Sequence, residues 1–227
     1  MSYHYGTGAY RLLGEQQWQY ALPQLHTTWA LTIGGRTCEV AGNLWLDRQR
    51  GLHPDLSRGT LTWMNTSVGN GDRMEMWSVS SRTTVESWAT VLHPDGTQEL
   101  SPVKALADSV TRVWRSPVSG QSFPTRWTVE MPSRQTVLTV TATPGIQEIV
   151  GPLTALYEGI ATVPGTYLGR PLTGLTYVEM VGNWTGVAGW SCAGVAAGTG
   201  PSGPAAYSRR RSARLPAEGG GNVDVDQ

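Results

Sequence analysis

The sequence predicts an all-β protein, an antiparallel β-barrel with an internal cavity. Roughly nine or ten short segments of alternating apolar and polar residues follow one another at the spacing typical of a sandwich or barrel. Ten tryptophans are present, and several of them recur at alternate positions in these segments. Only residues 101–109 resemble an internal helix. A barrel would also pair the strand edges that so many short strands otherwise expose.

The elements follow from this alternation in chain order. Residues 1–22 are expected to be an N-terminal extension, in which 10–20 form either a short helix or an edge strand. Residues 23–190 are expected to form the barrel, where Gly-rich or Pro-Asp-Gly turns join neighbouring strands. The predicted strands and hairpins are 27–33 with 37–47, 59–68 with 73–81, 85–100, 125–132, 135–144 and 155–184.

The C-terminal residues 191–227 are predicted to be a disordered tail, because they are rich in Gly, Ala and Pro. The tail carries the basic cluster Arg209, Arg210, Arg211 and Arg214. This cluster is either simply solvated or contacts an acidic partner such as a carrier protein. Deleting residues 195–227 is expected to leave folding and turnover unchanged.

Composition excludes several classes of partner. The formal net charge is zero, which argues against nucleic-acid binding. No apolar run approaches the length of a membrane span, and no secretory signal opens the chain. We therefore expect a cytoplasmic protein with Cys38 and Cys192 as free thiols. Lys104 is the one lysine among 17 basic residues and Phe occurs once, a bias typical of GC-rich bacterial genes.

The familiar cofactor motifs are missing. His4, His26, His53 and His93 stand alone in the sequence, without the spacing of metal ligands. The sequence also lacks a GxGxxG stretch after a strand, a phosphate-binding loop and a GxSxG elbow. We expect a protein that uses no cofactor, no metal and no acyl-enzyme intermediate.

The stretch GNLWLDRQRG, residues 42–51, places charge at the end of an apolar strand. Asn43, Trp45 and Asp47 share one face of this strand, and the two leucines between them share the other. If the leucines point away, the Asn-Trp-Asp face lines a polar cavity. The alternative is that Asp47 only pairs with Arg48 or Arg50 where the strand ends.

Six carboxylates fall within predicted strands: Asp47, Glu75, Glu86, Glu130, Glu158 and Glu179. Glu158 and Glu179 belong to the two halves of the last hairpin. If these halves pair, the two carboxylates lie close together, share a proton, and leave one of them acidic at neutral pH. The alternative is that each one accepts hydrogen bonds from an Arg or Trp and fixes the strand register.

Three segments together resemble the lipocalin-like carotenoid hydratase (hydroxyneurosporene synthase) family. They are GNLWLDRQRG, WRSPVSGQSFPTRWTVEMP and LYEGIATVPGTYLGRPLTGLTYVEMVGNW, and their order and spacing agree over roughly residues 25–184. The resemblance implies a lipocalin-like barrel. It also implies one of two activities: hydration of an isoprenoid double bond, or ring closure by a pericyclase such as the decalin-forming Diels–Alderases and the tetronate polyether cyclases.

The chain departs from this family in its short length and in reading DRQRG, without the His and Trp that hydratase-like members carry beside the Asp. Both departures argue against a carotenoid hydratase. The short length and the GC-rich codon bias favour a cofactor-free cyclase that acts on a linear polyketide in bacterial natural-product biosynthesis, by [4+2] cycloaddition or a related ring closure. The alternatives are an acid-catalysed hydratase or isomerase of an isoprenoid polyene, with Asp47 as the acid, and a non-catalytic carrier of a hydrophobic ligand.

The expected ligand is a hydrophobic small molecule in a cavity of roughly 300–1,000 Å³, and homodimerisation is left open. A cyclase would lose about tenfold or less on Asp47→Asn and more on Trp45→Ala, whereas a hydratase would lose most of its activity on Asp47→Asn. The predicted catalytic residues are Asp47, Trp45, Glu158 and Glu179. The predicted substrate-binding residues are Asn43, Trp63, Asn65, Trp88, Trp127, Tyr157 and Tyr177.

Overall fold

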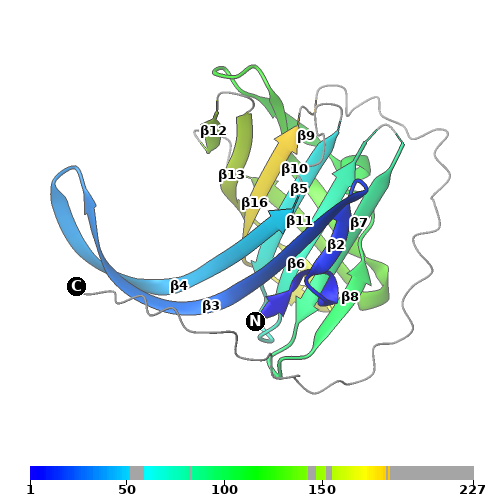
Figure 1. Ribbon diagram of the computed structural model, residues 1–227, viewed down its shortest axis with the longest axis horizontal. Coiled ribbons are helices and arrows are strands. Elements are labelled where there is room, and N and C mark those ends of the chain that lie inside the picture. The colour runs from blue at the N-terminus through cyan, green and yellow to red at the C-terminus, as the bar shows by residue number, and fades with distance from the viewer. Residues whose placement is uncertain (52–58, 82, 143–146, 152–154, 183, 185–227) are drawn as a thin grey trace. The chain divides into compact units, whose positions relative to one another are not determined.

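The protein folds into two antiparallel β-sheets, seen in a computed structural model (Figure 1). The structure describes residues 1–51, 59–81, 83–142, 147–151, 155–182 and 184, all within one compact unit. The all-β, lipocalin-like barrel predicted from the sequence is confirmed. The predicted tail, residues 191–227, lies outside the described residues.

The N-terminal residues form a four-stranded sheet rather than a separate extension. Its strands are β1 (Ser2–Tyr3), β2 (Ala9–Leu12), β3 (Glu15–Ile33) and β4 (Arg36–Gly51), with the 3₁₀ turn η1 (His4–Gly6) between the first two. The long strand β3 pairs with each of the other three. The predicted boundary at residue 22 therefore falls inside a strand, and the stretch 10–20 is β-structure rather than helix.

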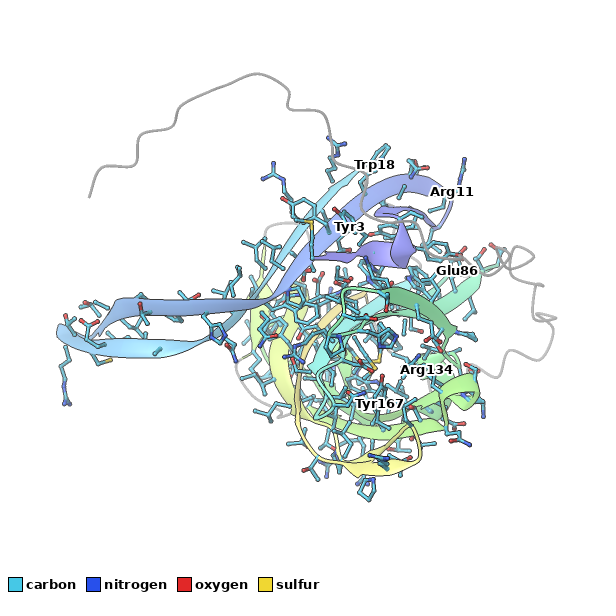
Figure 2. All side chains as sticks on the ribbon, turned by 90° about the horizontal axis from the view of Figure 1, so that it is seen from below. Tyr3, Arg11, Trp18, Glu86, Arg134 and Tyr167 are labelled. Carbon is cyan, nitrogen blue, oxygen red and sulfur yellow. The ribbon has the colours of Figure 1, made fainter. Side chains whose placement is uncertain are left out.

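The distal half of β3 and β4 is a two-stranded ribbon, here called the arm, which comprises residues 25–44. It begins at a bulge between Leu22 and Leu25 and ends in a turn where Gly34 and Gly35 both adopt positive φ. Figures 1 and 2 show the arm extending away from the other strands. Trp29, Leu31 and Ile33 share one of its faces and are exposed. The predicted hairpin around this turn is confirmed, but it is much longer than expected.

The main sheet has twelve strands and curls into an incompletely closed barrel. Neighbouring strands along its central path are, in order, β15-β14-β11-β13-β16-β5-β6-β7-β8. Off this path, β10 pairs with β11, β9 pairs with β10, and β12 pairs with β13. Among the described residues no ladder joins β8 to β9. The strands are β5 (Thr60–Ser67), β6 (Arg73–Ser80), β7 (Val85–Leu92), β8 (Gln98–Pro102), β9 (Arg112–Arg115), β10 (Ser122–Met131), β11 (Thr136–Ala142), β12 (Glu148–Val150), β13 (Ala155–Thr162), β14 (Gly165–Tyr167), β15 (Arg170–Leu172) and β16 (Leu175–Gly182).

The predicted helix at 101–109 is reduced to the 3₁₀ turn η2 (Leu106–Ser109); a third 3₁₀ turn, η3 (Pro132–Arg134), follows β10. The backbone N–H groups that an α-helix would use go elsewhere. Lys104 N donates to Glu130 O at 3.0 Å, and Leu106 N donates to Ser78 Oγ at 3.3 Å. Tertiary hydrogen bonds to the sheet thus replace the helix. Within the described chain, no helix has the length and apolar character needed to cross a membrane.

The two faces of the main sheet have different neighbours. Alternate side chains point to opposite faces of a strand, so each strand contributes to both. The inner face packs into the main core, whose largest fully buried members are Trp127, Tyr157, Phe123, Met64, Met74, Met76, Met131, Leu138 and Met180. The outer face of β5, β6 and β7 meets the N-terminal sheet in a second apolar cluster, which includes Tyr10, Trp63, Trp77 and Trp88.

A polar network holds one end of the barrel together. Tyr167 donates its hydroxyl proton to Asp72 Oδ2 at 2.5 Å and accepts a hydrogen bond from Arg134 at 2.7 Å. Figure 2 shows Arg134 and Tyr167 beside each other. His93 Nδ1 lies 2.8 Å from Asp72 Oδ1. Asp72 and the Tyr167 hydroxyl, both buried, are therefore paired within this network.

Candidate functional site

A half-open pocket of about 440 Å³ lies where β4 approaches the outer face of β5, β13 and β16. Its volume falls in the range predicted for a ligand cavity. The position differs from the one expected, because the inner face of the sheet is filled by large core side chains. The lining residues are Trp45, Asp47, Trp63, Asn65, Glu158, Tyr177 and Glu179.

Strand register brings five of these residues together in two adjacent rows. In the first row Glu158 pairs with Glu179, which in turn pairs with Trp63. In the second row Tyr177 pairs with Asn65. Directly paired residues have Cβ atoms about 4.5–5.5 Å apart and point to the same face. The pairing that the sequence predicted for Glu158 and Glu179 is therefore present.

Asp47 enters the pocket from β4. Its Oδ1 accepts a hydrogen bond from Trp45 Nε1 at 3.0 Å. The residue as a whole is exposed at the pocket mouth, but its carboxyl group lies among the lining groups. Burial raises the pKa of Asp47 to about 7, the charge of Glu75 adds to this, and hydrogen bonds with Trp45 and Gln19 oppose it.

The predicted alternative for Asp47, an ion pair with a neighbouring arginine, is not seen. Among the described residues Asp47 forms no salt bridge. Arg50 instead lies over the ring of Trp18, with 5.3 Å between the guanidinium carbon and the ring centroid. Leu44 and Leu46 are exposed and have the opposite strand parity to Trp45 and Asp47, as predicted.

The two glutamates are electrostatically coupled. Burial raises the pKa of Glu179 to about 7, and the charges of Glu158 and Asp47 contribute. Burial also raises the pKa of Glu158, against the effect of a hydrogen bond with Tyr177. Burial and the charge of Glu158 raise the pKa of Tyr177 to about 12, so its hydroxyl stays protonated and can donate.

The aromatic side chains provide walls and one free donor. Trp63 is 5% exposed, and its indole N–H has no hydrogen-bond partner among the described residues. A buried donor without a partner carries an energetic cost. Indole and phenol rings also present negative faces that attract positive charge.

The arrangement suits proton transfer. Two carboxyl groups with pKa values near 7 can each hold or release a proton at neutral pH, which general acid–base catalysis requires. A pair of facing carboxyls also shares a proton more readily than it ionises twice. No group of three or more His, Cys, Asp or Glu in the described part of the chain is placed to hold a metal ion.

Four predicted binding residues lie outside this pocket. Asn43 is exposed on the arm, and Trp88 is buried in the second cluster, where its N–H donates to His4 Nε2 at 3.1 Å. Trp127 and Tyr157 belong to the main core. Alternation shows which residues share a face, but not which of the two faces carries the pocket. The prediction that Trp127 and Tyr157 line the pocket is wrong, because both side chains point to the inner face of the sheet.

Other residues that shape the site have weak sequence signals. His4 appears isolated in the sequence, yet its Nδ1 lies 3.1 Å from Glu75 Oε2. Glu75 was recognisable as a strand carboxylate, and it pairs in register with Asn65. Gln19 hydrogen-bonds Asp47, but nothing in its sequence context distinguishes it from any other strand glutamine.

Comparisons with known proteins agree with this fold. The AttH-like family model matches residues 7–183. The dehydratase AsqC of Emericella nidulans is 24% identical over an alignment of 189 residues, and the match covers 78% of this chain and 53% of that protein.

Two solved structures have the same fold. Kievitone hydratase from Nectria haematococca superposes with a TM-score of 0.69 and 22% identity, covering 79% of this chain and 57% of that one. A Nitrosomonas europaea protein classed as AttH gives a TM-score of 0.62 and 20% identity, covering 74% and 52%. The chain thus spans about half the length of these relatives. The resemblance to a lipocalin-like family with hydratase members is confirmed, and the chain belongs to the AttH-like family.

Proposed function

We propose that this protein is an enzyme that uses acid–base catalysis and no cofactor. It adds water to a carbon–carbon double bond of a hydrophobic substrate, or eliminates water to form such a double bond. The observation that carries the proposal is the gathering of Asp47, Glu158 and Glu179 in one aromatic pocket, where Asp47 and Glu179 have pKa values of about 7. A dehydratase and a hydratase among the relatives support it.

In the hydration direction, Asp47 donates its proton to one alkene carbon. The electron pair of the double bond forms the new C–H bond, and positive charge develops on the neighbouring carbon. The faces of Trp45 and Trp63 stabilise that charge. Water attacks this carbon, and its proton passes to the Glu158–Glu179 pair, so that H and OH are added in total. Dehydration runs the same steps in reverse.

The test uses the purified full chain with a panel of prenylated phenols and conjugated polyenes. Mass spectrometry should find a product that differs from its substrate by one water. In D₂O, hydration should place one deuterium on carbon. Products that are isomers of their substrates and carry no deuterium on carbon would rule out the proposed hydratase or dehydratase activity.

A cofactor-free cyclase that acts on a linear polyketide is the second candidate. The specific observation in its favour is the set of hydrogen-bond donors on the pocket wall: Trp63, Asn65 and Tyr177. Aimed at a carbonyl head group, these would stabilise charge during ring closure while the aromatic walls hold the chain folded. This activity would give a product of unchanged mass and would tolerate Asp47→Asn.

A further inference from the structure

A further carboxylate, outside the three that line the pocket, is fully buried next to it. Glu75 on β6 stands opposite the pocket residue Asn65 and has no exposed surface. It contacts His4, which is equally buried, with 3.1 Å between His4 Nδ1 and Glu75 Oε2. This pair lies between the main sheet and the N-terminal sheet, and the acid chemistry described above does not use it.

The hydrogen bonds of His4 define its charge. Trp88 Nε1 donates to His4 Nε2 at 3.1 Å, so Nε2 carries a lone pair and not a proton. The proton therefore resides on Nδ1, which donates to Glu75. The imidazole is neutral, in agreement with a pKa that burial lowers. Neutral His4 therefore donates a hydrogen bond to Glu75 but brings no positive charge to it.

The other oxygen of Glu75, Oε1, has no hydrogen-bond partner among the described residues. No described lysine or arginine forms a salt bridge with Glu75. An unscreened charge in a buried environment acts over a longer range than one in water. In the pocket this charge acts on Asp47, whose pKa it raises in addition to the larger effect of burial.

A layer of uncharged polar groups connects the pair to Asp47. The ring of Tyr10 packs against His4, with 4.4 Å between centroids. Gln49 Nε2 donates to the Tyr10 hydroxyl at 2.9 Å, and that hydroxyl lies 3.4 Å from Gln19 Oε1. Gln19 in turn hydrogen-bonds Asp47. Besides Asp47 and the neutral His4, the titratable groups that face this layer are Tyr10 on β2 and Glu179 on β16.

We propose that Glu75, held in place by His4, is a positioning residue whose buried negative charge keeps the proton on Asp47 at neutral pH. The N-terminal segment thereby helps to set the acid strength of the pocket. This rests on the proposed function only in taking Asp47 as the acid. The charge of Glu75 and its effect on Asp47 exist in the resting protein, so both can be measured without a substrate.

The experiment is a ¹³C NMR titration of the full chain labelled at aspartate carboxyl carbons, with Asp47 assigned from Asp47→Asn. Glu75→Gln keeps the shape of the side chain and removes the charge. We expect the titration midpoint of Asp47 to fall by about one pH unit, a tenfold rise in its acid dissociation constant. Glu86→Gln, which removes a half-buried carboxyl from β7, should leave the midpoint unchanged. An unchanged midpoint in folded Glu75→Gln overturns the proposal.

A second variant covers the case in which Glu75→Gln does not fold. Glu75→Met fills a similar volume and removes the same charge, so the Asp47 midpoint should again fall. No fall overturns the proposal. If hydration is detected, the alkaline limit of the activity of Glu75→Gln should move to lower pH by the same amount. A shifted midpoint in a protein without hydratase activity would refute the proposed function and leave this inference standing.

Discussion

Glu158 and Glu179 lie directly opposite each other on β13 and β16, with both side chains toward the pocket. Like charges in directly paired positions destabilise a sheet. The sheet tolerates the pair because a proton on Glu179, whose pKa is raised to about 7, removes most of the repulsion. The pocket is therefore built to bind protons at neutral pH, and three of our predictions follow from that property.

The first prediction concerns stability against pH. The folded-state pKa of Glu179, about 7, lies above its ordinary value of 4.5, so the folded protein binds a proton that the unfolded chain has released. The contribution of Glu179 to stability is then greatest below about pH 4.5 and is lost as pH rises through 7. Glu179→Gln should remove this loss and be more stable than the wild type at alkaline pH by about 2 kcal/mol, after allowance for partial solvent screening.

Urea unfolding on both sides of this range measures the difference. Glu39→Gln, which changes an exposed carboxylate on the arm, is the matched control and should keep the wild-type slope. A Glu179→Gln protein whose stability changes with pH in the same way as that of the wild type would contradict the raised pKa.

The second prediction concerns the acid itself. Asp47→Asn should reduce hydration or dehydration by about 10²–10⁴-fold, the range for loss of a general acid, with little change in substrate binding. The measurement is kcat and KM at neutral pH. A cyclase would give a different pattern: Asp47→Asn would reduce its activity by about tenfold or less, and Trp45→Ala would reduce it more. That pattern would favour the cyclase over the hydratase or dehydratase.

The third prediction uses the bond between Trp45 and Asp47. Trp45→Phe keeps an aromatic wall but removes the N–H that stabilises the carboxylate at 3.0 Å. Because that hydrogen bond lowers the pKa of Asp47, its loss should raise the pKa and move the alkaline limit of activity to higher pH. An alkaline limit that stays unchanged or moves to lower pH would show that the indole N–H does not stabilise the Asp47 carboxylate. The pH–rate profile is the readout, and the direction is opposite to that expected for Glu75→Gln.

The fourth prediction tests the donor on the pocket wall. Trp63→Phe should lower the thermal midpoint only through the smaller buried ring, because the indole N–H has no partner in the described residues. KM should rise by about 2–10-fold if this N–H binds an oxygen of the substrate, the usual contribution of one hydrogen bond. An unchanged KM would assign Trp63 a purely steric role.

The fifth prediction concerns the arm. A two-stranded ribbon without further packing is only marginally stable in water. Amide protons of residues 26–33 and 36–43 should exchange with D₂O far faster than those of the central strands β5 and β6. Exchange as slow as in the central strands would mean that the exposed face of Trp29, Leu31 and Ile33 is covered in solution.

Much of this site followed from period-two alternation alone. Alternation placed Trp45 and Asp47 on one side of their strand, and both line the pocket. The hairpin argument also placed Glu158 near Glu179. These relationships are local or depend on one turn, so a sequence pattern can specify them.

What the sequence did not specify depends on tertiary packing. Which face of a strand is inside is decided by what covers the other face, and here the N-terminal sheet covers part of the outer one. The pairing of His4 with Glu75 joins positions 71 residues apart, which no spacing rule detects. The predicted helix near residue 105 does not form, because the backbone N–H groups of Lys104 and Leu106 donate their hydrogen bonds to the sheet residues Glu130 and Ser78.

The placement of the pocket on the outer face also has an evolutionary consequence. In β5 and β16 the residues that meet a ligand alternate with residues that fill the barrel, such as Asn65 beside Met64 and Glu179 beside Met180. A substitution at the first kind of position alters chemistry without opening a hole among the methionines. Selection could therefore exchange one reaction for another on this scaffold while the barrel that supports it stays intact.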